Sequence, residues 1–296
     1  RGAFMKCHDA GSWNLHPAIA KSCNTYFAQT YKRIIDKYKN PKLGMDAWYN
    51  HLRSFGLGQF LGYDLPIGRK GQIPNSEYYD RWYPKGGWKG TTTISNAIGQ
   101  GEITVTPIQL ANVMCAVANQ GYYYTPHIIK SIQDDKIDKN FVEKKTTTID
   151  KQHFFPVIEG LAEVYKSGTA SRLQIPDINI CGKTGTVENF IKVDGQKKQL
   201  KDHSVFLAFA PKEDPKIVIA VFIENGGFGA TIAGPIASLM IEKYLKGIIT
   251  RTDLEKRLLD STLESEYILK DQVEAEKRAK AKLEAELKAK QKRING

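Results

Sequence analysis

The stretch that decides the fold is INICGKTGT, residues 178–186, in which an Ile-Asn-Ile-Cys run passes into Gly-Lys-Thr-Gly-Thr. From Asp177 the hydrophobic pattern changes from the helical period to the two-residue period of a strand. The segment therefore predicts a strand that ends at Lys183-Thr184-Gly185-Thr186 and is followed by a polar loop.

Such a strand end can perform three tasks together. Its backbone can accept an extended peptide as an added strand, its Lys and Thr side chains can bind a carboxylate, and Gly185 permits close approach. Alone the tetrapeptide is a weak signal, because a glycine-rich turn after a strand is common and usually structural. A Walker A phosphate loop is excluded, since that motif needs a glycine at position 177, which holds Asp.

The sequence around this segment predicts alternating helices and strands. Two further apolar strands are expected over 204–210 and 217–223, and their short connection favours an antiparallel hairpin. Helices are expected over 25–38 with Asn24 as N-cap, from Pro107 to just before Gly121 with Thr106 as cap, over 151–165, and over 235–245. The apolar positions expected to face inward on the second helix are Leu110, Val113, Met114 and Val117.

Composition narrows the function classes. Hydrophobic residues make up 41% of 296 residues, enough for a sizeable core, and the formal net charge is +11. The densest basic cluster, Lys192–Lys201, lacks the interleaved aromatics of a single-strand binding platform, so we expect a solvated loop there and no nucleic-acid partner.

The ends of the chain differ from its middle. The start at Arg1 lacks Met and the charged-then-apolar order of a signal peptide, so we expect a piece of a longer protein. Residues 1–248 are expected to form the C-terminal part of one domain. Residues 249–296 carry interspersed charge and predict an exposed helix or a frayed tail, with a coiled-coil partner as the alternative.

The cysteines and a polar cluster near the start are candidate metal or redox sites. The four cysteines include no CxxC pair, and the two beside motifs, Cys23 and Cys181, are expected to be small buried residues. The metal-capable side chains near the start are Cys7, His8, Asp9 and His16. Their spacing matches no standard zinc site, so we predict no metal and no cofactor.

Ser22-Cys23-Asn24 is the second informative element. Taken alone it is explained as a helix cap. A Ser-x-Asn far upstream of a strand-borne Lys-Thr-Gly is, however, the motif order of serine penicillin-recognising enzymes, which also carry Ser-x-x-Lys. No serine of this chain has Lys three residues later.

More of the chain carries the same resemblance. The matching segments are SCNTYF at 22–27, IGQG at 98–101, VTPIQL at 105–110, CGKTGT at 181–186, HSVF at 203–206, FAP at 209–211 and IENGG at 223–227. In order and spacing they resemble the elongation-type class B penicillin-binding proteins over about residues 1–247. The resemblance implies an α+β fold of the serine β-lactamase and penicillin-binding transpeptidase type, with an antiparallel sheet flanked by helices on both faces.

The resemblance also implies a function and a role for each residue. The activity would be peptidoglycan D,D-transpeptidation through an acyl-serine, with the nucleophile and its lysine in a Ser-x-x-Lys before Arg1. Ser22 would relay a proton, Asn24 would hydrogen-bond the absent lysine and the donor peptide, and Lys183 would supply positive charge near the substrate carboxylate. Thr184 and Thr186 would bind that carboxylate, the Thr186 N–H would serve the oxyanion hole, and Gly185 would let the substrate approach.

Partners and location follow from the same resemblance. The expected partners are peptidoglycan stem peptides, β-lactam antibiotics, a SEDS-family glycosyltransferase and elongation-complex proteins. The catalytic domain would lie on the outer face of the cytoplasmic membrane, held by an anchor outside these residues. Two alternatives remain: a β-lactamase or β-lactam sensor of the same fold, and a non-catalytic scaffold module.

Overall fold

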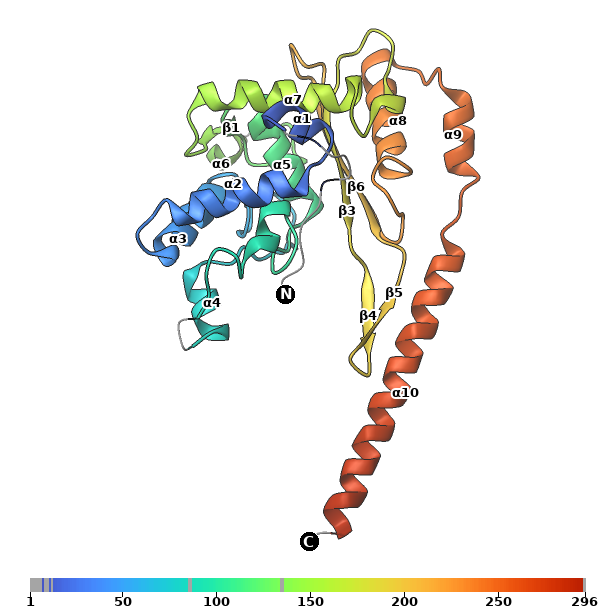
Figure 1. Cartoon of the computed structure of the whole chain (residues 1–296). Helices are drawn as coiled ribbons and strands as arrows, with labels where there is room; N and C mark the ends of the chain where they lie inside the picture. The colour runs from blue at the N-terminus through green and yellow to red at the C-terminus, as the bar shows by residue number, and fades with distance from the viewer. Residues whose placement is uncertain (1–6, 8–10, 12, 85–86, 134–135, 295–296) are drawn as a thin grey trace.

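The computed structural model describes residues 7, 11, 13–84, 87–133 and 136–294 (Figure 1). Its central element is a three-stranded sheet in the order β3-β6-β7, built from β3 (Cys181–Val187), β6 (His203–Ala210) and β7 (Ile217–Ile223). Both pairings are antiparallel, so the predicted hairpin between the last two strands is confirmed.

The first strand of this sheet differs from its prediction. It begins at Cys181, three residues after the predicted start at Ile178, and runs through the whole Lys-Thr-Gly-Thr segment to Val187. The reason is its pairing with β6, which continues from Cys181 opposite Phe209 to Val187 opposite His203. The apolar residue Ile178 instead forms an isolated bridge with Ile175.

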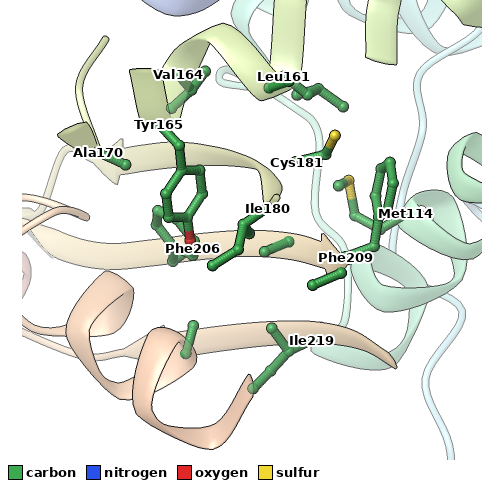
Figure 2. Packing of buried hydrophobic residues seen from close by; sticks show 14 of the residues in the cluster. Met114, Leu161, Val164, Tyr165, Ala170, Ile180, Cys181, Phe206, Phe209 and Ile219 are labelled. Carbon is green, nitrogen blue, oxygen red and sulfur yellow. The ribbon is translucent and has the colours of Figure 1, made fainter. Parts of the chain in front are cut away.

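Helices pack against both sides of the sheet (Figure 1). On one side lie α5 (Pro107–Ala118) and α7 (Phe154–Lys166), and on the other lies α8 (Ala233–Lys246). Figure 2 shows Met114 of α5 and Leu161 of α7 facing the same apolar layer as Phe209 of β6. The expected α+β architecture, with an antiparallel sheet flanked by helices on both faces, is therefore confirmed.

Helix α5 confirms its predicted start but only part of its predicted inward face. Thr106 and Gln109 form a reciprocal capping box, and Pro107 occupies the first turn. Met114 and Val117 are buried, whereas Leu110 and Val113 are partly exposed. Two amides face inward as well, because Gln109 donates to the carbonyls of residues 56, 59 and 70 and Asn112 donates to that of residue 55.

A second, smaller cluster forms beside the sheet domain. It joins α2 (Asn24–Asp36), α3 (Pro41–Ser54), α4 (Ser76–Trp82) and η1 (Ile94–Ile98). Its buried residues are Tyr31, Ile35, Met45, Tyr79 and Trp88. Helix α3 was not predicted, although Asn40 caps it by accepting a bond from Lys42 N.

The prediction of a solvated loop over Lys192–Lys201 is wrong. Most of this segment belongs to an antiparallel hairpin of β4 (Phe190–Val193) and β5 (Gln196–Gln199). Asp194 and Gly195 have φ angles of 50° and 75°. Positive φ at both central residues is the turn geometry that matches the twist of a two-stranded hairpin.

The remaining short elements connect these units. They are α1 (Leu15–Ala20), β1 (Tyr122–Tyr123), α6 (Lys139–Val142), β2 (Lys145–Thr146), η2 (Lys151–His153) and η3 (Ser171–Leu173). Strand β1 pairs with β2.

The C-terminal segment is helical, in α9 (Thr252–Leu259) and α10 (Glu264–Ile294). Its first turn is tied to the domain, because the Arg251 guanidinium donates to the buried Glu242 carboxylate at 3.0 Å. Helix α10 then runs beside the β4–β5 hairpin, where Val273 packs with Val193 and Leu200 (Figure 1). No helix within the described residues has both the length and the apolar character needed to cross a bilayer.

The packing of α5 gives a stability prediction. Replacing Met114 by Ala is expected to lower the free energy of unfolding by about 2–4 kcal/mol, because Met114 is 4% exposed and its loss leaves a cavity against the sheet. The matched control is Ile108→Ala on the same helix, where the side chain is 38% exposed and the cost is expected below about 1 kcal/mol. Urea unfolding measures both, and equal losses would contradict the assignment of the inward face.

Candidate active site

Ser22 lies in the tight turn that joins α1 to α2. Its N–H donates to Ile19 O at 3.2 Å, and the next N–H, of Cys23, donates to Ala18 O at 2.9 Å. The φ angle of Ser22 is 55°, in the left-handed region that side chains other than glycine seldom adopt. Such backbone strain is typical of functional positions, where the surrounding structure holds it in place.

Asn24 is the first residue of α2, not its N-cap. The cap position is occupied by Cys23, which makes no side-chain capping bond. The prediction of a helix over this segment is confirmed, but the prediction that Asn24 is its N-cap is wrong. Asn24 lies in the first turn of α2, two residues after Ser22.

Cys23 is buried as expected, but it is not a free thiol. It forms a disulfide with Cys7, 16 residues away. The cross-link joins the segment before α1 to the Ser22 turn, which restricts the unfolded chain. The other metal-capable candidates His8 and Asp9 lie outside the described residues. Cys181, by contrast, is a buried free cysteine, as the sequence predicted.

Lys183 faces Ser22 from β3. Its Nζ donates to Ser22 Oγ at 2.7 Å and to the carbonyl of Thr184 at 2.8 Å. The two side chains are 161 residues apart in sequence, so the fold alone brings them into contact. This bond places the Ser-x-Asn turn beside the Lys-Thr-Gly strand.

Burial changes the acid–base character of Lys183. Removal of its ammonium from water lowers the pKa of Lys183 from 10.5 to about 8. At neutral pH the side chain is still mainly charged, and it releases a proton far more readily than an exposed lysine. An amine poised in this way can attract an anion and also take part in proton transfer with the Ser22 hydroxyl.

The outer edge of β3 is the open side of the described sheet, since β3 is an end strand in the order β3-β6-β7. The inner edge of β3 pairs with β6, where Thr184, Gly185 and Thr186 lie opposite Phe206, Val205 and Ser204. An end strand can pair with an extended peptide through its free N–H and C=O groups. The arrangement fits the predicted peptide-binding role of this segment.

One glycine within this strand relieves a tight contact, and one glycine beside the strand is required. A Cβ built on Gly185 would lie 3.2 Å from the Val205 Cβ, which is a tight contact. A Cβ built on Gly229 would lie 2.4 Å from Val205 O and 2.6 Å from Gly185 O. The loop that contains Gly229 therefore supports the backbone of β3 at Gly185 from close range.

Thr169 contacts Thr184 of the candidate site, and the sequence did not single it out. Its Oγ1 lies 2.8 Å from Thr184 Oγ1. The only sequence signal was the Ser-Gly-Thr turn that follows helix α7, and such a turn looks like any other loop. A contact of this kind becomes visible only when α7 is placed beside β3.

Comparison with known proteins decides the family. The model of the penicillin binding protein transpeptidase domain matches residues 4–242. The chain belongs to the penicillin-binding transpeptidase family. The elongation-type subgroup predicted from the motifs agrees with its relatives.

The most informative relatives are of one kind. The chain is 34% identical to peptidoglycan D,D-transpeptidase MrdA of Acinetobacter baumannii over 242 residues, covering 75% of this chain and 33% of the relative. Its fold matches Pseudomonas aeruginosa PBP2, crystallised with WCK 5153, with a TM-score of 0.62 and 28% identity over 78% of this chain and 48% of that one.

A second solved structure is Helicobacter pylori PBP2 in complex with MreC. The TM-score is 0.61 at 27% identity, with 80% of this chain and 41% of that chain covered. The chain covers 33% of the length of MrdA from Acinetobacter baumannii, about a third of that relative.

The lowered pKa of Lys183 predicts a pH dependence of stability. Between about pH 8 and pH 10.5 the unfolded chain binds the Lys183 proton and the folded chain has lost it, so stability rises with pH across that window. Replacing Lys183 by Met is expected to remove this rise, because no amine remains to titrate.

Urea unfolding of both proteins from pH 7.5 to 10.5 provides the measurement, and the difference between the two curves isolates Lys183 from the other titrating groups. If the stability curves of the wild type and the Met variant stay parallel throughout, burial does not lower the pKa of the Lys183 amine.

Proposed function

We propose that this chain forms the substrate-binding half of a peptidoglycan D,D-transpeptidase of cell-wall elongation. The observation that carries the proposal is the bond from Lys183 Nζ to Ser22 Oγ at 2.7 Å, beside an open strand edge that bears Thr184 and Thr186. Family membership supports the same reading.

The proposed reaction has two steps. A serine hydroxyl adds to the carbonyl of the penultimate D-Ala, the bond to the terminal D-Ala breaks, and that residue leaves with a proton on its amine. An amine of a neighbouring stem peptide then attacks the ester, forms the new amide and returns the serine hydroxyl. The nucleophilic serine and its lysine are proposed to come from a Ser-x-x-Lys motif outside these 296 residues.

Each site residue has a role in this scheme. Ser22, in contact with the Lys183 ammonium, relays the proton to the departing amine. Asn24 hydrogen-bonds the amide of the donor peptide and the lysine of the Ser-x-x-Lys motif. Thr184 and Thr186 bind the terminal carboxylate by charge-assisted hydrogen bonds, and Lys183 adds the opposite charge nearby. The Thr186 N–H serves the oxyanion hole, and Gly185 keeps the strand edge accessible.

Partners and location are proposed from solved structures of related proteins. One PBP2 structure is a complex with MreC, and another related structure is a peptidoglycan synthase complex that coordinates polymerisation and crosslinking. We infer that this chain likewise works with an elongation-complex scaffold and a SEDS-family glycosyltransferase. Its candidate site would then face the peptidoglycan on the outer side of the cytoplasmic membrane.

The proposal predicts where penicillin will react. The full-length protein that contains this chain is expected to form one covalent adduct with a fluorescent penicillin, whereas the 296-residue chain alone is expected to form none. The reason is that the proposed nucleophile and its base belong to a Ser-x-x-Lys motif, which these 296 residues do not contain, while Ser22 is assigned to proton relay. Intact-mass measurement after equal exposure gives the stoichiometry.

Two controls separate the alternatives. Ser22→Ala in the full-length protein should slow adduct formation without removing the attachment site, and stoichiometric labelling of the isolated chain at Ser22 would make Ser22 the nucleophile. Release of the adduct within seconds would indicate a β-lactamase. Absence of any adduct on the full-length protein would indicate a non-catalytic scaffold.

A further inference from the structure

The turn after α7 contacts both the end of α1 and strand β3. The Thr169 N–H donates to Ala20 O at 3.2 Å, two residues before Ser22. The Thr169 hydroxyl lies 2.8 Å from the hydroxyl of Thr184, the residue next to Lys183. One residue therefore connects the end of α1 to the substrate strand.

Together with the direct contact, these bonds form a closed ring. Lys183 Nζ bonds Ser22 Oγ, Thr184 follows Lys183 in β3, Thr184 bonds Thr169, and Thr169 bonds Ala20, which leads back to Ser22. The Ser22 turn and the Lys183 strand are thus held at two points. A ring of this kind restricts their separation more firmly than either bond alone.

The backbone of the turn has little freedom to move away. A Cβ built on Gly168 would lie 2.4 Å from Ala20 O and 2.7 Å from the Val164 Cα. Only glycine fits so close to the end of α1, and Ala170 N–H adds a bond to Val164 O at 3.1 Å. The Thr169 hydroxyl is consequently presented to Thr184 from a fixed support.

The direction of the hydroxyl bonds decides what Thr184 can do. A threonine hydroxyl has one proton to donate and two lone pairs that accept. Lys183 Nζ donates toward Thr184 Oγ1 at 3.5 Å and occupies one lone pair. If Thr169 donates to the other, the single Thr184 proton is left for a ligand, and a ligand that accepts without donating is favoured.

We propose that Thr169 is a positioning residue for the substrate carboxylate: its hydroxyl donates to Thr184 Oγ1 and so makes Thr184 a donor directed at that carboxylate. This inference rests on the proposed function, because it takes the terminal carboxylate of a D-Ala-D-Ala peptide, or of a penicillin, as the ligand of Thr184. Thr169 acts through Thr184 and does not touch the reacting atoms.

The test compares two variants of the full-length protein. Thr169→Val keeps the shape and removes the hydroxyl, while Thr169→Ser keeps the hydroxyl. We expect Thr169→Val to lower the second-order rate of acylation by penicillin about three- to tenfold, the effect of one neutral hydrogen bond. Thr169→Ser is expected to stay within about twofold of wild type by the same principle.

A second probe separates positioning from a general loss of structure. Penicillin methyl ester lacks the carboxylate, so Thr169→Val should slow its acylation much less than that of penicillin. Thr148→Val is the matched control, because it removes another threonine hydroxyl, one that bonds His51 and Ser54, and it should change neither rate. Equal slowing of acid and ester, or equal loss in the Val and Ser variants, overturns the proposal.

Failure of the proposed function is recognised separately. If the wild-type protein forms no adduct with penicillin, the transpeptidase assignment fails, and the Thr169 inference is judged by crystal structures of the wild type and both variants. A Thr184 side chain that keeps its rotamer and position in Thr169→Val refutes the positioning role. A Thr184 side chain that turns in the Val variant and is restored in the Ser variant supports it.

Discussion

The hydrogen bond between Lys183 Nζ and Ser22 Oγ is the constraint on which the rest of the structure depends. An ammonium that is partly withdrawn from water is costly unless polar atoms surround it, so the Ser22 turn and β3 must meet in one register. Helix α7 makes this possible because it packs along α1 and then leads, through the turn at Gly168, toward β3. The sheet, α7 and the α1–α2 turn therefore act as one scaffold for a single contact.

Much of this scaffold was predictable from the sequence because it rests on local pattern. The strands over 204–210 and 217–223 have continuous apolar residues and a short connection, and Thr106-Pro107 begins α5. The β4–β5 hairpin was not predicted, because a lysine-rich segment without interleaved aromatics also fits a solvated loop. The pair Asp194-Gly195 was the stronger signal, since it specifies a tight turn between two strands.

The site divides in the same way. Ser22 and Lys183 were found through motif order, which is written in the sequence, and their contact followed. Thr169 was not found, because its role exists only when the end of α7 lies beside both α1 and β3. The buried amide of Gln109 was not predicted for a related reason. Apolar periodicity does not reveal a polar side chain that is buried because it donates hydrogen bonds to loop carbonyls. The disulfide of Cys23 likewise joins segments that spacing rules do not relate.

The attachment of α10 has a mechanical consequence. The N-terminal half of α10 is held to the strands and their connections by four solvent-accessible ion pairs, and the buried Val273 packs among them. The pairs are Lys201–Glu266, Lys270–Glu224, Lys198–Glu276 and Lys280–Asp194. Exposed pairs weaken as salt rises, whereas the Arg251–Glu242 pair is shielded from solvent. Rising ionic strength therefore weakens the attachment of α10 to the β4–β5 hairpin before it weakens the Arg251–Glu242 contact that precedes α9. Residues 260–263 then act as the hinge of helix α10, whose 31 residues at the helical rise span about 46 Å.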